Sequence, residues 1–376
     1  MSQQSTFLRF RDIRIATLGY WAMLSLTILS IYFPPFRHLA YLVPFIALYI
    51  GLADGRFKTN GINAPFVFLL AAGLSMSALA NTAGFKDMFF ICSGLSASLV
   101  LSRQKIDTKL LLAVFAVGTV TSALMYGGGL SNGLVYNLAS SQSSFEGNFG
   151  FLFGALAVYA GLKRQKWVFL LALLGAALAL KRIVLIAVLA CWLVSLLPER
   201  IARRVLNPFV LVPVNLTIIA ILMVYANHQF DYWLTFATGQ SANQFGMGRQ
   251  EIYAAVAHDI FADPLRYVLF GAGPGAAYDS LGKFLGAANL HSDLLKIFFE
   301  YGLVMFSVFL WLGYRMRDVR VRIMFLYANI LYATDNVLIY HFFLFFLCLF
   351  ALAIEKESDK PVAGSSTGGR LAAALP

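Results

Sequence analysis

Two adjacent cations, Lys181 and Arg182, interrupt an apolar stretch in the sequence ALALKRIVLIAV. The turn available between the two flanking apolar runs is very short, so the pair is expected at the boundary of a membrane. Guanidinium and ammonium groups at such a boundary bind phosphate through charge-assisted hydrogen bonds. We therefore treat Lys181 and Arg182 as candidate phosphate ligands. The alternative is that both side chains simply extend to the headgroups of the outer leaflet.

A third cation, Arg249, opens the stretch GMGRQEIYAAVAHDIFADP, residues 246–264. Apolar residues recur every fourth position from Ile252 to Ile260, which predicts a short amphipathic helix that ends just before Pro264. Arg249 then lies in the first turn, where free backbone N–H groups and the positive end of the helix dipole already favour an anion. This placement predicts an anion site, and the alternative is an ordinary solvated arginine.

The sequence LHSDLLKIFFEYGLVMF, residues 290–306, places His291 at the water boundary of a long apolar run. A histidine has a pKa suited to a general base. Glu300 follows nine residues later, roughly 13 Å deeper along a helix, and an ionisable residue at that depth predicts a functional role. His228 and His258 are competing candidates for the base, and the alternative for His291 is an interfacial residue without a role in chemistry.

Neither a metal site nor a bound cofactor is expected from the remaining patterns. The acidic residues of the expected external loops stand singly, apart from Asp259 and Asp263, and one such pair is a weak basis for a cation site. Cys92, Cys191 and Cys348 all lie in apolar runs, where they are expected to be small buried residues.

The glycine-rich sequence YVLFGAGPGAAYDSLGKF, residues 267–284, contains a weak form of the dinucleotide-binding pattern. The surrounding segment is too short for repeated βαβ units, so a dinucleotide-binding domain is rejected. A tight glycine-rich turn is expected instead.

These candidate residues must be positioned by membrane helices. The chain of 376 residues is 60% hydrophobic and 12% charged, against about 25% charged in an ordinary soluble domain. The composition therefore predicts an all-α polytopic membrane protein and excludes a soluble enzyme. Twelve segments are apolar enough to be predicted spans: 15–33, 39–53, 64–81, 87–102, 109–126, 147–162, 167–180, 183–197, 207–226, 293–313, 322–334 and 337–354.

Counting Lys and Arg by loop sets the expected orientation. With the N-terminus in the cytoplasm, 21 of the 29 cations fall on the cytoplasmic side, and this asymmetry predicts that both termini lie inside. The net charge of +11 is thus mostly a topology signal rather than a sign of nucleic-acid binding.

The division of the chain follows from this topology. A single transmembrane domain is expected over residues 1–354, with one long periplasmic loop, 227–290, between the ninth and tenth spans, a shorter external loop, 127–146, and a disordered cytoplasmic tail, 355–376. Every cytoplasmic loop is short, so the site is expected on the outer face.

Several of these motifs occur in an order that resembles the O-antigen polymerase and ligase superfamily of bacterial envelope glycan assembly. The resemblance covers the order of spans over most of the chain. It is carried by His291-Ser292 with Leu295 and Gly302, by Gly248-Arg249 ahead of Ile252-Tyr253 and Gly271-Ala272-Gly273, by Arg182 between two central spans, and by Gly147-Asn148 at the start of the sixth.

The resemblance implies a twelve-helix bundle of glycosyltransferase C-type architecture in the bacterial inner membrane. It also implies a metal-independent, inverting transfer from an undecaprenyl-pyrophosphate-linked glycan to an acceptor on lipid. His291 would be the catalytic base, and Arg182, Arg249 and Lys181 would bind the pyrophosphate. Glu300, Ser292 and Arg266 are expected in supporting positions, and a protein that regulates chain length is an expected partner besides the bilayer.

Three functions follow as alternatives. The preferred one is a polymerase that joins lipid-linked repeat units, because His291 follows Arg249 by only 42 positions, which leaves little chain for seating lipid A-core. The second is a ligase that transfers finished glycan to lipid A-core. The third is a polysaccharide transporter, against which stand the absence of an evident repeat and the position of the unusual charges at the outer boundary.

Overall fold

The computed structural model describes residues 3–54, 61–100, 106–126, 136–137, 142–143, 145, 147–284 and 289–358. This part of the chain is helical apart from two short strands, β1 (Tyr136–Asn137) and β2 (Gln142–Ser143), which pair antiparallel. The expected all-α class is therefore confirmed.

Each of the twelve predicted segments contains a helix. They are α1 (Gln3–Tyr32), α2 (Val43–Asp54), α3 (Ala64–Ser75), α4 (Thr82–Val100), α5 (Thr108–Tyr126), α6 (Phe149–Leu162), α7 (Lys166–Leu178), α8 (Arg182–Leu196), α10 (Pro208–Ala226), α15 (Asp293–Tyr314), α16 (Val319–Tyr332) and α17 (His341–Ser358). Short connecting helices η1 (Pro34–Leu42), η2 (Gly61–Asn63), η3 (Ser77–Leu79) and α9 (Glu199–Val205) lie between them.

Three helical stretches in the described part are long and apolar enough to cross a membrane, namely Pro35–Leu52, Pro208–Ala226 and Asp293–Tyr314. Seven shorter apolar helices accompany them. Large apolar side chains also cover the outer surfaces of peripheral helices, as Leu170 and Leu174 of α7 and Ile186 and Leu189 of α8 show. Long apolar helices with apolar outer faces associate the protein with a membrane.

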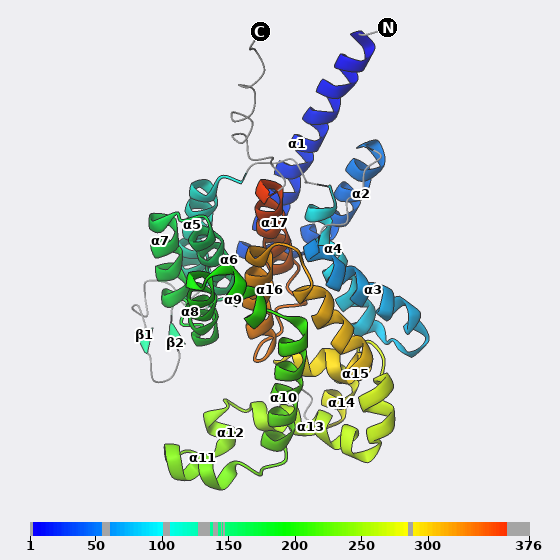
Figure 1. Cartoon of the computed structure of the whole chain (residues 1–376), viewed down its shortest axis with the longest axis vertical. Coiled ribbons are helices and arrows are strands. Elements are labelled where there is room, and N and C mark those ends of the chain that lie inside the picture. The colour runs from blue at the N-terminus through cyan, green and yellow to red at the C-terminus, as the bar shows by residue number, and fades with distance from the viewer. Residues whose placement is uncertain are drawn as a thin grey trace, which may run out of the picture.

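The helices pack around α6, α16 and α17 (Figure 1). Helices α5, α7 and α8 lie on one side of this centre, against α6, and α2 to α4 lie on the other, while α15 crosses below with α10, α13 and α14 beside it. Helix α6 reads FGFLFGALAVYAGL, which is apolar on every face, and such a helix is stable only when it is surrounded. Twelve of its fourteen residues are buried accordingly.

The segment 227–290 is built from short helices rather than from irregular loop. These are α11 (Asp231–Thr238), α12 (Ala242–Phe245), α13 (Arg249–Ala262), η5 (Arg266–Phe270) and α14 (Ala276–Phe284). A helix is confirmed here as α13, which begins at Arg249 and buries Tyr253, Val256 and Ile260. Its expected amphipathic character is not confirmed, because Phe261, which was expected beside the apolar residues, is exposed.

Other expectations are corrected or fall on residues outside the described part. Helix α17 continues to Ser358, so the expected start of the tail at residue 355 is wrong by one helical turn, and residues 359–376 lie outside the described part. Most of the external loop 127–146, including Glu146, also lies outside it. Cys92 is exposed on α4, whereas Cys191 and Cys348 are buried as expected.

Helix α15 is interrupted at Gly302, and the predicted glycine-rich turn fills the interruption. Gly302 has φ 74° and ψ 174°, a conformation that is essentially restricted to glycine. The break frees the carbonyl groups of Phe299 and Glu300, which accept hydrogen bonds at 2.9 Å from the backbone N–H groups of Ala272 and Gly273. Two segments about thirty residues apart are thereby joined backbone to backbone.

The same turn is held on its other side by the start of α4. The Asn81 side chain donates to the carbonyl of Gly275 at 2.9 Å, and the Asn81 backbone N–H donates to the carbonyl of Pro274 at 3.2 Å. The turn therefore connects the segment 227–290 to both α4 and α15.

We predict that Gly302→Ala destabilises the protein strongly. A Cβ at this position would lie 2.6 Å from the carbonyl oxygen of Leu269, and the backbone dihedral angles also disfavour any side chain. The expected result is a loss of about 2–4 kcal/mol, measured as the free energy of unfolding in detergent micelles.

Gly282→Ala is the matched control, because nothing lies within 4 Å of a Cβ built on Gly282 in α14. This control should be neutral or stabilising by up to about 1 kcal/mol. Equal effects at the two positions would contradict the role assigned to the break.

Candidate functional site

His291 lies directly before α15 and is held in an unusual backbone conformation. Its φ of 55° falls in the left-handed region, which is uncommon for a residue other than glycine. Ser292 follows as the N-cap of α15: its hydroxyl accepts from the N–H of Leu295 and donates to the carbonyl of Tyr332, both at 3.2 Å. The expected supporting position of Ser292 therefore corresponds to capping α15 and tying it to α16.

Arg249 reaches the same region from α13. It is the first residue of the helix, after Gly248 in the left-handed conformation, and its side chain is half-buried. One turn further on, the hydroxyl of Tyr253 donates to the carbonyl oxygen of His291 at 3.1 Å. This bond fixes the beginning of α13 against the residue that precedes α15.

Lys181 approaches from the hairpin between α7 and α8. Its ammonium group lies over the ring of Phe151 in α6, 5.8 Å from the ring centroid. The absence of a side chain at Gly150 permits this approach, since a Cβ there would be 3.1 Å from the Cγ of Lys181. Arg182 is the first residue of α8 and its side chain is exposed. Of the two adjacent cations, Lys181 is thus the one directed into the protein.

Asp335 is a fourth member of the cluster, and it was not among the predicted residues. It lies in the turn between α16 and α17, and its carbonyl accepts from the N–H of Asp293 at 3.1 Å. The Asp335 side chain is largely buried and accepts from the N–H of Asn336. A carboxylate in the few residues between two predicted spans was the available signal, because such a turn has little room to expose it.

Burial and, to a smaller extent, these charges set the protonation state of His291. Burial lowers the pKa of His291, and the positive charges of Arg249 and Lys181 lower it further, whereas the carboxylate of Asp335 opposes them. The pKa of His291 is therefore below its usual value of about 6.5, and the imidazole is neutral at pH 7. A neutral imidazole beside two cations can accept a proton while the cations hold an anion.

The competing histidines lack this environment. His228 is exposed and pairs with Asp231 at 2.9 Å, and His258 is exposed beside Asp259 at 3.6 Å. Arg266 is exposed too: it stacks on Tyr267, 5.4 Å from the ring centroid, and its backbone N–H donates to Asp263. Its contacts among the described residues thus place it outside the cluster around His291.

Glu300 belongs to a second, buried group of charges. The ammonium group of Lys296, one turn earlier in α15, forms an ion pair with Asp87 of α4. The hydroxyl of Tyr278 in α14 donates to Asp87 at 3.4 Å, and Lys296 lies 4.5 Å from the centroid of the Tyr278 ring. Glu300 accepts from the N–H of Ala277 at 3.4 Å.

This group joins three elements rather than contributing to the His291 cluster. Burial raises the pKa of Tyr278 to about 12, so its phenol stays protonated and can donate. Glu300 therefore supports α15 and α14 from within the bundle. Lys296 and Asp87 were not predicted, although Lys296 stands four residues before Glu300 on the same helix face.

In the part of the chain that the structure describes, no group of three His, Cys, Asp or Glu side chains is placed to hold a metal ion. Comparison of the chain with protein-family models, curated proteins and solved structures gives no match. The function of the protein must therefore be inferred from the geometry of the two charge clusters.

We predict that removing the charge of Lys181 and removing the charge of Asp335 shift the pKa of His291 in opposite directions. Lys181→Met removes a charge that lowers this pKa and should raise it, whereas Asp335→Asn removes a charge that raises it and should lower it. Diethyl pyrocarbonate modifies only the neutral imidazole, so the pH dependence of its reaction with His291, followed by peptide mass spectrometry, measures the pKa.

The wild-type midpoint should lie below pH 6.5. Lys283→Met removes an exposed cation of α14 and should leave the midpoint unchanged. Shifts in the same direction for Lys181→Met and Asp335→Asn would show that the three groups do not form one electrostatic cluster.

We further predict that Lys296→Met costs about 3–5 kcal/mol in the free energy of unfolding, because it leaves Asp87 and Glu300 buried without their cation. Combining it with Asp87→Asn should cost less than the two single changes together, by about 1–3 kcal/mol. Unfolding in mixed micelles measures all three variants. Strict additivity would refute the pairing, and Lys283→Met again serves as an exposed lysine control.

Proposed function

We propose that the protein is a membrane glycosyltransferase of the O-antigen polymerase type. Its donor is a glycan linked to undecaprenyl pyrophosphate, and its acceptor is a sugar hydroxyl on another lipid-linked repeat unit. The observation that carries the proposal is the convergence of His291, Arg249, Lys181 and Asp335 from four separate parts of an apolar helical bundle. A neutral base and two cations are the groups that transfer from a pyrophosphate donor needs.

The proposed reaction is a single displacement. His291 accepts the proton of the acceptor hydroxyl as its oxygen attacks the anomeric carbon of the donor. The bond between that carbon and the pyrophosphate oxygen breaks, and undecaprenyl pyrophosphate leaves with the bonding electrons. Arg249 and Lys181 stabilise the negative charge that develops on the leaving group, with Arg182 at the exposed edge of the same hairpin. One displacement without a covalent intermediate inverts the anomeric configuration.

The role that we propose for Asp335 follows from its negative charge. When His291 takes up a proton, the resulting imidazolium lies near two cations that disfavour it. The nearby carboxylate compensates for part of this repulsion, so Asp335 keeps proton transfer accessible without making His291 charged beforehand.

The proposed setting is the bacterial inner membrane, with twelve spans, both termini in the cytoplasm and the His291 cluster facing the periplasm. The asymmetric distribution of Lys and Arg supports this orientation. The helical pieces of segment 227–290 then form the periplasmic cover of the bundle. A protein that regulates chain length remains a proposed partner.

We predict that Arg249→Gln lowers the transfer rate about 10²–10³-fold and that His291→Asn lowers it about 10²–10⁴-fold. Asparagine tolerates the left-handed conformation of residue 291, so the variant tests the imidazole rather than the backbone. The measurement is polymer formation by purified protein from an undecaprenyl-pyrophosphate-linked repeat unit, with a chelator present.

Arg37→Gln is the matched control, since Arg37 is an exposed cation on η1 outside the cluster, and its rate should match that of the wild type. Wild-type polymer from both site variants would overturn the proposal.

In cells, loss of the gene should leave single repeats attached to lipid A-core. Loss of all attached glycan, with lipid-linked polymer accumulating, would identify a ligase instead.

A further inference from the structure

Helix α10 has the length and the outer surface of a membrane span. Its 19 residues extend about 28 Å at 1.5 Å per residue, and the hydrocarbon core of a bilayer is about 30 Å thick. One side of α10 packs on α15 and α13, whereas Phe209, Val214 and Ile221 are exposed. When α10 crosses the bilayer, its two ends therefore lie at the two boundaries between lipid and water.

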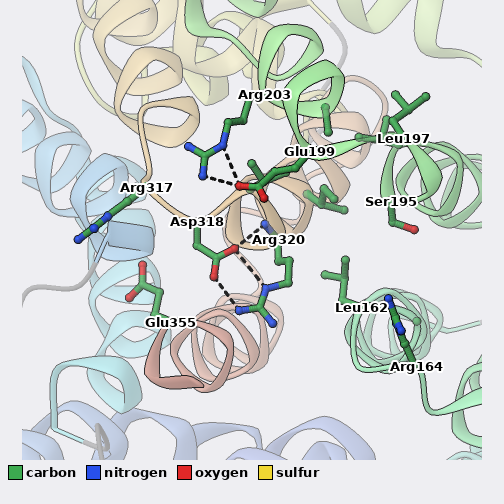
Figure 2. A pocket seen from close by; sticks show the side chains of 15 residues that line it. Leu162, Arg164, Ser195, Leu197, Glu199, Arg203, Arg317, Asp318, Arg320 and Glu355 are labelled. Atoms are coloured by element: carbon green, nitrogen blue, oxygen red, sulfur yellow. Dashed lines mark hydrogen bonds and ion pairs between the residues drawn. The ribbon is translucent and has the colours of Figure 1, made fainter. Parts of the chain in front are cut away.

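A polar pocket of about 720 Å³ lies where α10 begins, at the end of the bundle away from His291 (Figure 2). Helix α9, which directly precedes α10, forms part of its wall. Four arginines and three carboxylates line the pocket, and Figure 2 shows two ion pairs among them, Arg203 with Glu199 at 2.6 Å and Arg320 with Asp318 at 2.9 Å. So many charges are too costly inside hydrocarbon. The pocket therefore marks one boundary, and the far end of α10 lies at the other.

A tight turn joins the far end of α10 to α11. The backbone N–H of Gln229 donates to the carbonyl of Val224 at 3.3 Å, and His228 adopts the left-handed conformation with φ 62°. The His228 ring pairs at 2.9 Å with Asp231, the first residue of α11. Figure 1 shows α11 running across the direction of α10. A helix that turns sideways within five residues of the end of a span is level with the lipid headgroups.

One side of α11 is aromatic. Tyr232, Trp233 and Phe236 lie within about 100° of one another around the helix axis, and their side chains are 71%, 66% and 79% exposed. The Tyr232 ring stacks with that of Phe236, at 6.5 Å between centroids, and contacts that of Trp233 at 5.4 Å. Asp231 and Thr235 lie on the other side. The short helix is thus amphipathic, with a continuous aromatic face.

The polar side of α11 is held by the protein. The Gln250 side chain of α13 donates to the Asp231 carboxylate at 2.5 Å and to the carbonyl of Tyr225, near the end of α10, at 2.9 Å. These bonds fix α11 against α10 and α13 and direct its aromatic face outward. Gln250 directly follows Arg249, so α11 also braces the beginning of α13.

We propose that α11 docks on the bilayer, with Tyr232, Trp233 and Phe236 inserted about 5–10 Å into the boundary between headgroups and acyl chains. Two observations favour lipid over a protein partner. The aromatic face continues the exposed apolar side of α10 at the level where that helix leaves the bilayer. Tryptophan and tyrosine are also the residues enriched at this level of membrane proteins. The proposal requires that α10 cross the bilayer and does not depend on the glycosyltransferase activity.

The test places one spin label at a time on the full chain in vesicles of phosphatidylethanolamine and phosphatidylglycerol. The labelled variants are Phe236→Cys on the aromatic face, Thr235→Cys on the polar side and Ile221→Cys on the exposed side of α10. All three positions are exposed, so a label does not disturb the packing. Each variant also carries Cys92→Ala, because Cys92 is exposed, whereas the other two cysteines are buried.

Power-saturation electron paramagnetic resonance measures the accessibility of each label to oxygen, which concentrates in lipid, and to a water-soluble nickel chelate. The ratio of oxygen to nickel accessibility should be at least about threefold higher at Phe236→Cys than at Thr235→Cys. It should be highest at Ile221→Cys, the reference position within the bilayer. Unchanged melting temperatures of the unlabelled variants verify that the fold is retained.

Three results would contradict the proposal. Equal ratios at the two positions of α11, with both labels open to the nickel chelate, would show that the helix lies in water. Protection of Phe236→Cys from both reagents would show that protein covers the aromatic face, and dipolar coupling between labelled copies would identify a second copy as that protein. Nickel access at Ile221→Cys would remove the premise that α10 crosses the bilayer.

Discussion

The interruption of α15 at Gly302 imposes a constraint on which both charge clusters depend. Inside an apolar bundle, a broken helix leaves backbone carbonyl groups that must find donors. Ala272 and Gly273 supply these donors, which draws the glycine-rich turn into contact with α15. Helices α13 and α14 lie before and after the turn in the sequence. The turn thereby places α13 beside His291, where α15 begins, and α14 beside Lys296 and Glu300, further along α15.

Two consequences follow from this placement. Tyr253 of α13 reaches the carbonyl oxygen of His291, which sets Arg249 beside the histidine at the mouth of the bundle. Tyr278 of α14 reaches Lys296 and Asp87 one layer deeper. The deeper ion pair holds α4 to α15, so the beginning of the helix that follows His291 is fixed. A catalytic group gains precision when the element that carries it is rigid.

The sequence predicted those features whose signals are local. Runs of apolar residues predicted the twelve helices, the four-residue spacing predicted α13, and glycines predicted the turn. It did not predict partners, because Asp87 and Lys296 are more than two hundred residues apart and neither residue type specifies the other. Asp335 was missed for a related reason, because it matters only through its proximity to His291. That proximity arises when the turn between α16 and α17 packs against the start of α15, and the sequence gives no sign of this packing. Lys181 and Arg182 were inseparable in sequence, and the direction of the hairpin distinguishes them.

At the end of the bundle away from His291, some of the arginines have specific partners in the folded protein. A positive charge that only orients the chain during insertion needs no particular position afterwards. At this end Arg203 and Arg320 pair with Glu199 and Asp318, so the folded protein itself balances part of this positive charge. Arg164 and Arg317 line the pocket at this end together with a third carboxylate, that of Glu355. Three carboxylates thus accompany four arginines at one place, so little net positive charge is left there.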